Sequence, residues 1–221
     1  MKRGRRGAKP GDAAPRGAPE AKKSLRAQMK ERVSSVGAFA RDRRSRAAAA
    51  LAVRAPALSR ARLVLAYRAM PDEIDADPLV RALEARGVRI AFPRVDGRGA
   101  LELFAPPAGH ALAPCFFTRD RFGILSPDPD APAVQRIEPA AIDAVVVPGR
   151  AFDARGARLG RGMGFYDGLI ARLRPDARAA TIGLCHGEQI VEAVPEDAHD
   201  RRVAWIATDR SLVRARAAAR A

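Results

Sequence analysis

Cysteine is scarce in this chain: Cys115 and Cys185 are the only two among 221 residues. They lack the close spacing of metal-binding cysteines, and they suggest no disulfide framework. We therefore expect a protein of a reducing compartment, the cytoplasm. Long apolar runs are missing too, because no stretch approaches the roughly 18 uninterrupted apolar residues of a membrane span. The basic N-terminus has no apolar segment, so we expect neither a secretory signal nor a membrane partner.

Acidic and aromatic residues are also few. The chain has 25 Asp/Glu against 40 Lys/Arg, a net charge of +15, and aromatics make up 5%. Such a basic chain commonly binds nucleic acid. However, seven of the excess charges lie within residues 1–26 and four more follow Asp209, and few aromatics are available for base stacking. We expect no specific nucleic-acid partner, although the basic ends could bind polyanions weakly.

Composition divides the chain into three parts. Residues 1–20 are rich in Gly, Pro, Ala and Arg without apolar periodicity, which predicts a disordered basic extension. Residues 21–209 are expected to form a single domain, the default for this length. Residues 210–221 are expected to be a basic tail, and we expect a monomer.

One stretch, Val145–Leu169, contains the densest chemical signal. Val145–Val147 predict a short buried strand that stops at Pro148-Gly149. A loop with interleaved glycines and arginines follows, closes on Phe165-Tyr166-Asp167, and leads into a helix expected over Leu169–Leu173. The glycines and arginines of this loop are Gly156, Gly160, Gly162, Gly164, Arg155, Arg158 and Arg161.

This residue pattern suits a bound phosphate. Glycines let backbone N–H groups turn toward an anion, and a following helix adds its positive end. Arginines supply forked donors for phosphate oxygens, and a carboxylate such as that of Asp167 can hold the magnesium that accompanies a nucleotide. The pattern is neither GxxxxGK[ST] nor GxGxxG, and a flexible or RNA-contacting linker remains the alternative.

The rest of the chain alternates strand and helix. Leu25, Met29 and Val33 form one apolar stripe of a helix, and residues 39–60 are expected to be helical. Residues 61–70 predict a strand and Asp77-Pro78 a helix start that Gly87 ends. A strand over Val88–Phe92, stopping before Pro93, would complete a parallel strand–helix–strand unit.

The C-terminal half continues this alternation. Residues 94–140 predict short strands and loops. These strands could form a small antiparallel extension that borders the site. Strands are expected at Ala180–Leu184 and Val203–Ala207. The pattern predicts an α/β sandwich.

Two further groups of charged residues are candidates for binding. Lys22, Lys23 and Arg26 occupy the start of a helix, where cations oppose the helix dipole, so a phosphate partner or simply a solvated face would explain them. Glu73 follows the first strand, where ligands of open α/β sheets bind. Its alternative is an acid that complements the next helix, although Asp75 and Asp77 suit that role better.

With these elements in order, the chain resembles the 5-formyltetrahydrofolate cyclo-ligase (methenyltetrahydrofolate synthetase) family from about residue 21 to 209. The residues that carry the resemblance are KKSLR at Lys22–Arg26, MPDEID at Met70–Asp75, RGVRIAFPRV at Arg86–Val95, PGRAFDARGARLGRGMGFYD at Pro148–Asp167, Gln189, and VPEDAHD at Val194–Asp200. The RLGxGxGxYD pattern is highly specific to the family.

The resemblance implies a three-layer α/β sandwich with a mainly parallel central sheet and helices on both faces. It also implies a cytosolic ATP- and Mg²⁺-dependent ligase that converts 5-formyltetrahydrofolate to 5,10-methenyltetrahydrofolate and releases ADP and phosphate. The implied ATP-binding residues are Lys22, Arg26, Arg158, Leu159, Gly160, Arg161, Gly162, Met163, Gly164, Phe165 and Tyr166. The implied folate-binding residues are Arg68, Glu73, Arg161, Gly162, Met163, Gly164 and Phe165. Arg158, Arg161 and Tyr166 would be catalytic, and Asp167 and Asp200 would hold magnesium.

The chain departs from the family pattern at a few positions. Arg150 replaces a small or apolar residue, Met163 a glycine or lysine, and Phe165 the first tyrosine of a pair. His186 occupies a common aromatic position and Ala204 that of a frequent aspartate. Two alternatives therefore stay open: a same-fold ATP-dependent enzyme for another anionic substrate, and a nucleic-acid-binding protein that uses the basic ends and the Gly/Arg loop.

Overall fold

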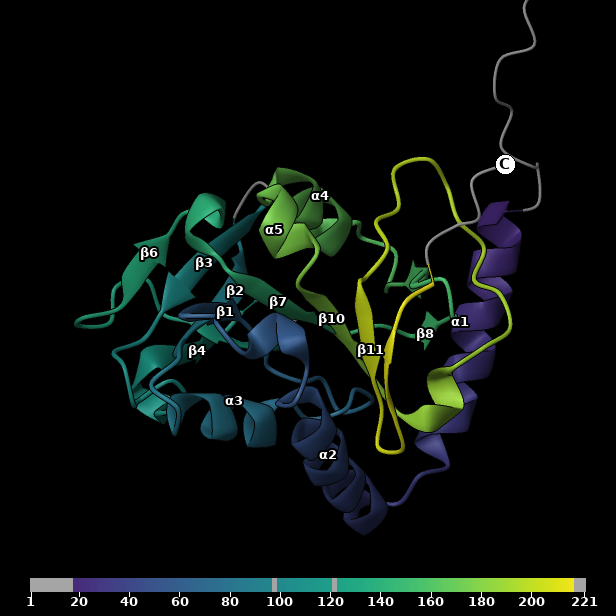
Figure 1. Ribbon diagram of the computed structural model, residues 1–221, viewed down its shortest axis with the longest axis horizontal. Coiled ribbons are helices and arrows are strands. Elements are labelled where there is room, and N and C mark those ends of the chain that lie inside the picture. The colour runs from purple at the N-terminus through teal and green to yellow at the C-terminus, as the bar shows by residue number, and fades with distance from the viewer. Residues whose placement is uncertain (1–17, 97–98, 121–122, 217–221) are drawn as a thin grey trace, which may run out of the picture.

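The computed structural model describes residues 18–96, 99–120 and 123–216 as a central sheet between two helical layers (Figure 1). The eight strands lie in the order β12-β11-β10-β7-β1-β2-β3-β6. The inner five, β11, β10, β7, β1 and β2, are mutually parallel, and the outer strands pair antiparallel. The predicted α/β class with a mainly parallel sheet is confirmed.

The sheet strands are short. Their bounds are β1 Leu63–Leu65, β2 Arg89–Val95, β3 Leu101–Ala105, β6 Gln135–Ile137, β7 Ala144–Val147, β10 Thr181–Leu184, β11 Trp205–Ala207 and β12 Leu212–Arg214. Two small hairpins stand apart from the sheet: β4 Phe117–Arg119 with β5 Leu125–Pro127, and β8 Ala151–Phe152 with β9 Arg158–Leu159.

Alternation along the inner strands creates two apolar cores. Val64 and Val146 face the layer of α2 (Ala38–Ala52) and α3 (Asp77–Glu84), whereas Leu65 and Val147 face the layer of α4 (Phe165–Arg172) and α5 (Pro175–Arg178). Because successive side chains of a strand point to opposite faces, a sheet buried on both sides needs apolar residues throughout. Figure 1 shows α2 and α3 on one side of the sheet and α4 and α5 on the other.

A third cluster attaches the N-terminal helix. In α1 (Ala18–Ser34) the predicted stripe is confirmed, because Met29 is fully buried, Val33 is nearly so, and Leu25 packs beside Met29. Met29 shares its cluster with Leu159 of β9 and with Val194. Figure 1 shows α1 beside β8, at the end of the molecule away from β6. The cluster therefore places the start of α1 near the Gly/Arg-rich loop.

The predicted strand–helix–strand unit is confirmed as β1–α3–β2, but the expected end of β2 is wrong. The strand continues through Pro93 to Val95. Proline lacks a backbone N–H and is excluded from strands bonded on both sides. Pro93 is tolerated because β1 pairs with β2 only as far as Ala91, and beyond it β2 pairs with β3 alone.

Residues 94–140 form the predicted antiparallel extension: β3 and β6 extend the sheet, and β4–β5 adds a hairpin. The helix expected over residues 39–60 is shorter, since α2 ends at Ala52. Single 3₁₀ turns complete the described elements: η1 Pro56–Leu58, η2 Pro114–Phe116, η3 Pro139–Ala141 and η4 Gly187–Gln189.

Both expected ends of the domain are corrected. Helix α1 begins at Ala18, so residues 18–20 belong to it, and residues 1–17 lie outside the described part. The tail expected from residue 210 contains β12, which pairs antiparallel with β11. A turn closed by the Thr208 N–H and the Ser211 carbonyl at 2.8 Å makes this hairpin, and the Arg214 guanidinium lies 5.9 Å from the Trp205 ring. Residues 217–221 lie outside the described part.

Candidate active site

A cavity of about 460 Å³ gathers nearly all of the predicted site residues. It opens beside the carboxyl ends of β1 and β7, where an open α/β sheet binds ligands. The predicted residues that line it are Lys22, Arg26, Arg68, Glu73, Arg158, Gly160, Arg161, Gly162, Met163, Gly164, Phe165, Tyr166, Asp167 and Asp200. Leu159 is the exception, because its side chain is buried in the cluster around Met29.

The loop from Gly160 to Gly164 forms one wall of the cavity. Gly162 and Gly164 have φ of +107° and +69°, a region that favours glycine. Helix α4 begins at Phe165, four residues earlier than expected, so Asp167 lies in its first turn. The start of the loop is tied to α1, where Arg26 Nε donates to the Gly160 carbonyl at 2.9 Å. Tertiary contacts therefore place a glycine-rich loop, a helix N-terminus and α1 cations together.

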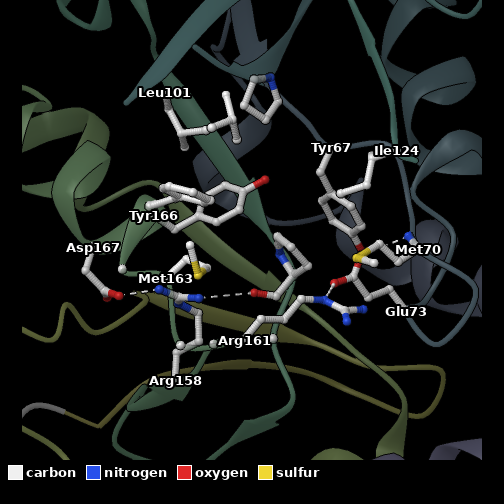
Figure 2. Close-up of a pocket in the computed structure, with 18 of the residues that line it drawn as sticks. Tyr67, Met70, Glu73, Leu101, Ile124, Arg158, Arg161, Met163, Tyr166 and Asp167 are labelled. Carbon is white, nitrogen blue, oxygen red and sulfur yellow. Dashed lines mark hydrogen bonds and ion pairs between the residues drawn. The ribbon is translucent and has the colours of Figure 1, made fainter. Parts of the chain in front are cut away.

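Arg158 lies at the centre of this cationic end. Its side chain is only 3% exposed, and its Nη2 donates to Asp167 Oδ1 at 2.9 Å (Figure 2). Its guanidinium lies 5.7 Å from the Tyr166 ring. A Cβ at Gly160 would fall 2.9 Å from Arg158 Nη1, so a larger residue there would displace the guanidinium. Within the described residues Arg158 Nε is buried and has no hydrogen-bond partner. It is an available donor next to the cavity.

Lys22 lies between two carboxylates of the segment that follows Val194. Its Nζ is 2.6 Å from Asp197 Oδ2 and 2.5 Å from Asp200 Oδ2. Burial opposes its charge, but these two partners outweigh that effect and raise the Lys22 pKa. Burial likewise opposes ionisation of Asp200, and the hydrogen bond from Lys22 lowers the pKa of that carboxyl overall. Both groups are therefore charged at neutral pH.

The carboxylates at this end fit a magnesium ion. Asp167, Asp197 and Asp200 line the same cavity, and ligand atoms of Asp197, His199 and Asp200 lie within 4.8 Å of one another. The Arg201 N–H donates to Asp167 Oδ1 at 3.1 Å, which joins the segment of Asp200 to the start of α4. Carboxylate oxygens are the protein ligands that magnesium prefers.

The opposite end of the cavity is largely apolar. Its lining includes Tyr67, Met70, Leu101, Ile124, Leu125, Phe165 and Tyr166. The Tyr67 hydroxyl donates to the Ile74 carbonyl at 2.7 Å. Burial and then the nearby charge of Glu73 raise the pKa of both Tyr67 and Tyr166, so both phenols stay protonated. In Figure 2 the ring of Tyr166 lies on the Asp167 side of the cavity and that of Tyr67 on the Glu73 side. An aromatic, planar molecule suits such walls.

Glu73 supplies a carboxylate at this apolar end. Its side chain is 8% exposed, its Oε1 accepts from Arg161 Nε at 3.0 Å, and its Oε2 accepts from the Met70 N–H at 3.0 Å. Figure 2 shows Arg161 reaching toward Glu73, whereas Arg158 reaches toward Asp167. The two catalytic arginines expected from the sequence therefore serve opposite ends of one cavity. Arg68 also lines this end, but its guanidinium is paired with Asp77 at 2.8 Å.

Sequence reasoning assigned no role to several residues that the structure brings to this region. Asp72 binds both Arg161 and Arg150. Asp197 binds Lys22, and its neighbour His199 lines the cavity. Asp72 and Asp197 each stand one to three residues from a predicted site residue, yet only the positions of their distant partners distinguish them from ordinary surface acids.

Comparison with known proteins identifies the family of this chain. A model of the 5-formyltetrahydrofolate cyclo-ligase family matches residues 18–209. The chain belongs to that family. It is therefore a cyclo-ligase by class, and the resemblance seen in its motifs is confirmed.

Relatives across long evolutionary distances support the cyclo-ligase assignment. The chain is 24% identical over 186 residues to the 5-formyltetrahydrofolate cyclo-ligase of Mus musculus, covering 83% of this chain and 91% of that one. It is 26% identical over 204 residues to the probable 5-formyltetrahydrofolate cyclo-ligase of Schizosaccharomyces pombe, with coverage of 87% and 97%.

A solved cyclo-ligase relative has the same architecture. The NMR structure of the Aquifex aeolicus 5,10-methenyltetrahydrofolate synthetase superimposes with a TM-score of 0.73 at 26% identity. The match covers 90% of this chain and 95% of that one. The sheet, its helical layers and most of the chain are thus shared with the family. No helix in the described part of this chain is long and apolar enough to cross a membrane.

Proposed function

We propose that this cyclo-ligase converts 5-formyltetrahydrofolate to 5,10-methenyltetrahydrofolate in an ATP- and Mg²⁺-dependent reaction that releases ADP and phosphate. We further propose that it acts in the cytoplasm, as a monomer with one domain. Family membership supports the reaction class, and the residues of this chain support the use of a nucleotide.

One observation carries the proposal: a single cavity joins a cationic end to an apolar end. Lys22, Arg26 and Arg158 line the first, together with the loop at Gly160–Gly164. Aromatic and aliphatic side chains line the second, around the carboxylate of Glu73. Transfer of a group between two molecules requires both to be held in one site with their reacting atoms aligned.

The cationic end suits the triphosphate of ATP. Arginine and lysine side chains neutralise phosphate oxygens, and the first-turn N–H groups of α4 add a positive dipole end. Arg158 is held in place by the protein, because Asp167 and the Tyr166 ring contact its guanidinium. A donor fixed in advance stabilises developing charge without reorganisation.

The apolar end suits the pterin and benzoate rings of the folate. Tyr67, Tyr166 and Phe165 provide aromatic surface, and Leu101 and Ile124 complete the walls. Glu73 would accept hydrogen bonds from N–H groups of the pterin ring. Its carboxylate is already oriented by the Met70 N–H and by Arg161, so it recognises a donor edge at a defined position.

In the first chemical step the formyl oxygen attacks the γ-phosphorus of ATP. The bond from that phosphorus to the β,γ-bridging oxygen breaks, and ADP leaves. The products of this step are ADP and an imidate-like phosphate of the folate. Arg158 would neutralise the negative charge that accumulates on the phosphoryl group, and the chain contributes positioning and charge neutralisation rather than a protein nucleophile.

In the second step N10 of the folate attacks the activated formyl carbon. The carbon–oxygen bond to phosphate breaks, phosphate leaves with the bonding electrons, and the proton of N10 passes to a phosphate oxygen. The five-membered ring is then closed as the methenyl cation. The aromatic walls hold the benzoate nitrogen against the formyl carbon, which replaces an entropically costly encounter with a local one.

Asp167 and Asp200, with Asp197 beside them, are the residues that would hold magnesium. When bound, magnesium supplies charge neutralisation on the transferring phosphates. Lys22 at this end would then be released from the two carboxylates it now contacts and become available to the nucleotide.

A spectrophotometric assay for methenyltetrahydrofolate tests the proposal. With purified protein and 5-formyltetrahydrofolate, product absorbance is expected only when both ATP and Mg²⁺ are present. An EDTA-treated reaction and one with ADP in place of ATP are the controls. ATP hydrolysis or MgATP binding without cyclisation would instead indicate another anionic substrate, and the absence of MgATP binding would reject the proposal.

A further inference from the structure

A chain of alternating charges runs from Arg150 to Glu73, and its last two members, Arg161 and Glu73, line the cavity. Arg150 donates to Asp72, Asp72 also accepts from Arg161, and Arg161 donates to Glu73. The four residues come from three segments: the loop after β1, the turn after β7, and the glycine-rich loop. Ion pairs that share partners in a network constrain geometry more than isolated surface pairs do.

Arg150 is the fixed end of this network. Its backbone N–H donates to the Leu159 carbonyl at 2.7 Å, and its carbonyl accepts from Gln189 Nε2 at 3.1 Å. Gln189 is itself buried and also donates to the Gly149 carbonyl at 2.7 Å. The side chain of Arg150 is 12% exposed. Backbone and side chain are therefore both held, and Arg150 offers Asp72 a stationary cation.

Asp72 connects Arg150 to Arg161, because its carboxylate accepts hydrogen bonds from both side chains. Burial opposes its ionisation, but the hydrogen bonds and charges of Arg161 and Arg150 lower the Asp72 pKa overall, so it is an anion at neutral pH. Arg161 is the second residue of the loop Gly160–Gly164, in which Gly162 and Gly164 have positive φ. Met163, two residues later, is 61% exposed. A loop of this kind has little intrinsic stiffness. The orientation of Arg161 therefore depends on its side-chain partners.

We propose that Arg150 and Asp72 are positioning residues that hold Arg161 at the folate end of the cavity, beside Glu73. This inference rests on the proposed function and assigns residues to the substrate specificity of that site. Arg150 does not line the cavity and acts through Asp72. We call the ion pairs of Asp72 with Arg150 and Arg161 the latch. With the latch intact, the Arg161 side chain is held where it contacts the folate. Without the latch, the loop allows Arg161 to point toward the phosphates or into solvent.

Kinetics of two variants test this latch. Arg150→Leu and Asp72→Asn are each expected to raise the KM for 5-formyltetrahydrofolate roughly 10- to 100-fold, as misplacement of a contact group does, while the KM for MgATP changes less than about threefold. Arg150→Lys, which keeps the charge, is expected to restore most of the loss. In an Arg161→Gln background, Arg150→Leu is expected to have almost no further effect, because the two residues act in series.

The matched control is Arg174→Leu, which removes another arginine paired with an aspartate, Asp143, outside the cavity. It is expected to leave both KM values unchanged. Equal rises in both KM values for Arg150→Leu, or additive effects with Arg161→Gln, would overturn the inference and indicate a general structural role.

Hydrogen exchange of the substrate-free protein separates this inference from the proposed function. Amides of residues 160–164 are expected to exchange several-fold faster in Asp72→Asn and Arg150→Leu than in the wild type or Arg174→Leu. That result does not depend on turnover. If the wild type produces no methenyltetrahydrofolate, the proposed function fails while the exchange data still decide whether the latch exists. Unchanged exchange in both variants would reject the latch.

Discussion

The residues at the cationic end are held by contacts within the protein itself. Arg158 lies under the loop at Gly160, pairs with Asp167, and contacts the Tyr166 ring. Lys22 is held between Asp197 and Asp200. Each cation is thus paired with a carboxylate that belongs to the proposed magnesium site, so removal of one carboxylate affects both the metal and an arginine or lysine.

Asp167→Asn is expected to lower kcat at least about 100-fold, because the amide neither neutralises Arg158 nor binds magnesium well. The fold is expected to persist, since the amide oxygen still accepts from the Arg201 N–H. Turnover at saturating MgATP and a thermal melt measure the two effects. Asp176→Asn, at an exposed acid outside the cavity, is the control. Normal turnover in Asp167→Asn would remove this residue from the metal site.

Glu73→Gln is expected to weaken folate binding more than nucleotide binding, because Glu73 lies with Arg161 and Met70 at the apolar end. Loss of one charge-assisted hydrogen bond costs about 1.5–3 kcal/mol, or roughly a 10- to 150-fold rise in the folate KM. Steady-state kinetics with each substrate varied in turn measure this difference. A matching rise in the KM for MgATP would argue against a role in recognising the pterin.

Among the elements, the loop between β9 and α4 depends most on backbone conformation. Gly164 caps α4 with φ +69° and ψ +4°, and a Cβ there would meet nothing within 4 Å. A substitution at Gly164 therefore probes left-handed conformation without a steric clash. Gly168 lies four residues later inside α4 and is equally open.

Gly164→Ala is expected to reduce the free energy of unfolding by about 1–2 kcal/mol, the cost of a left-handed alanine. Gly168→Ala is the matched control and is expected to increase it by about 0.5–1 kcal/mol, because alanine favours a helix interior. Chemical denaturation of both variants measures the effects. Equal changes of the same sign would mean that the loop adjusts to a right-handed conformation at little cost.

At the scale of the whole molecule, the buried aspartate Asp153 connects segments that are distant in sequence. Asp153 is completely buried and accepts from the N–H groups of Arg155, Ala157 and Val194. Burial opposes its ionisation, but the Arg155 side chain and these N–H groups lower its pKa overall. The Asp153 carboxylate thus joins the β8–β9 hairpin to the segment that carries Asp197 and Asp200.

This shift has a defined pH dependence. The folded pKa of Asp153 lies below the unfolded value of about 3.9, so the unfolded chain binds more protons at acid pH and the stabilisation is lost as pH falls through the folded pKa. At pH values below about 4, the free energy of unfolding is expected to decrease as the pH is lowered. This decrease is expected to be less steep for Asp153→Asn than for the wild type or Asp176→Asn. Denaturation at several pH values measures the slope, and identical slopes would contradict this account.

Much of the molecule followed from local pattern. The β1–α3–β2 unit, the buried strand expected at Val145–Val147 and the stripe at Leu25 and Met29 were predictable because apolar periodicity reports which side of an element is buried. The Gly/Arg loop and its neighbouring acids were also recognisable, since residue types at short spacing carry the motif. The end of β2 and the strand Leu212–Arg214 were not, because each depends on which strand lies beside it.

The sequence by itself determined the α/β class, the family and the set of residues that could bind phosphate, since these are encoded in composition and short-range order. Only the tertiary structure decided how those residues divide between the two ends of one cavity. It turned Arg158 toward Asp167 and Arg161 toward Glu73, and it brought Arg150 to Asp72 across 78 positions of the chain. Pairing between distant side chains depends on packing of the whole sheet, and no local pattern contains that information.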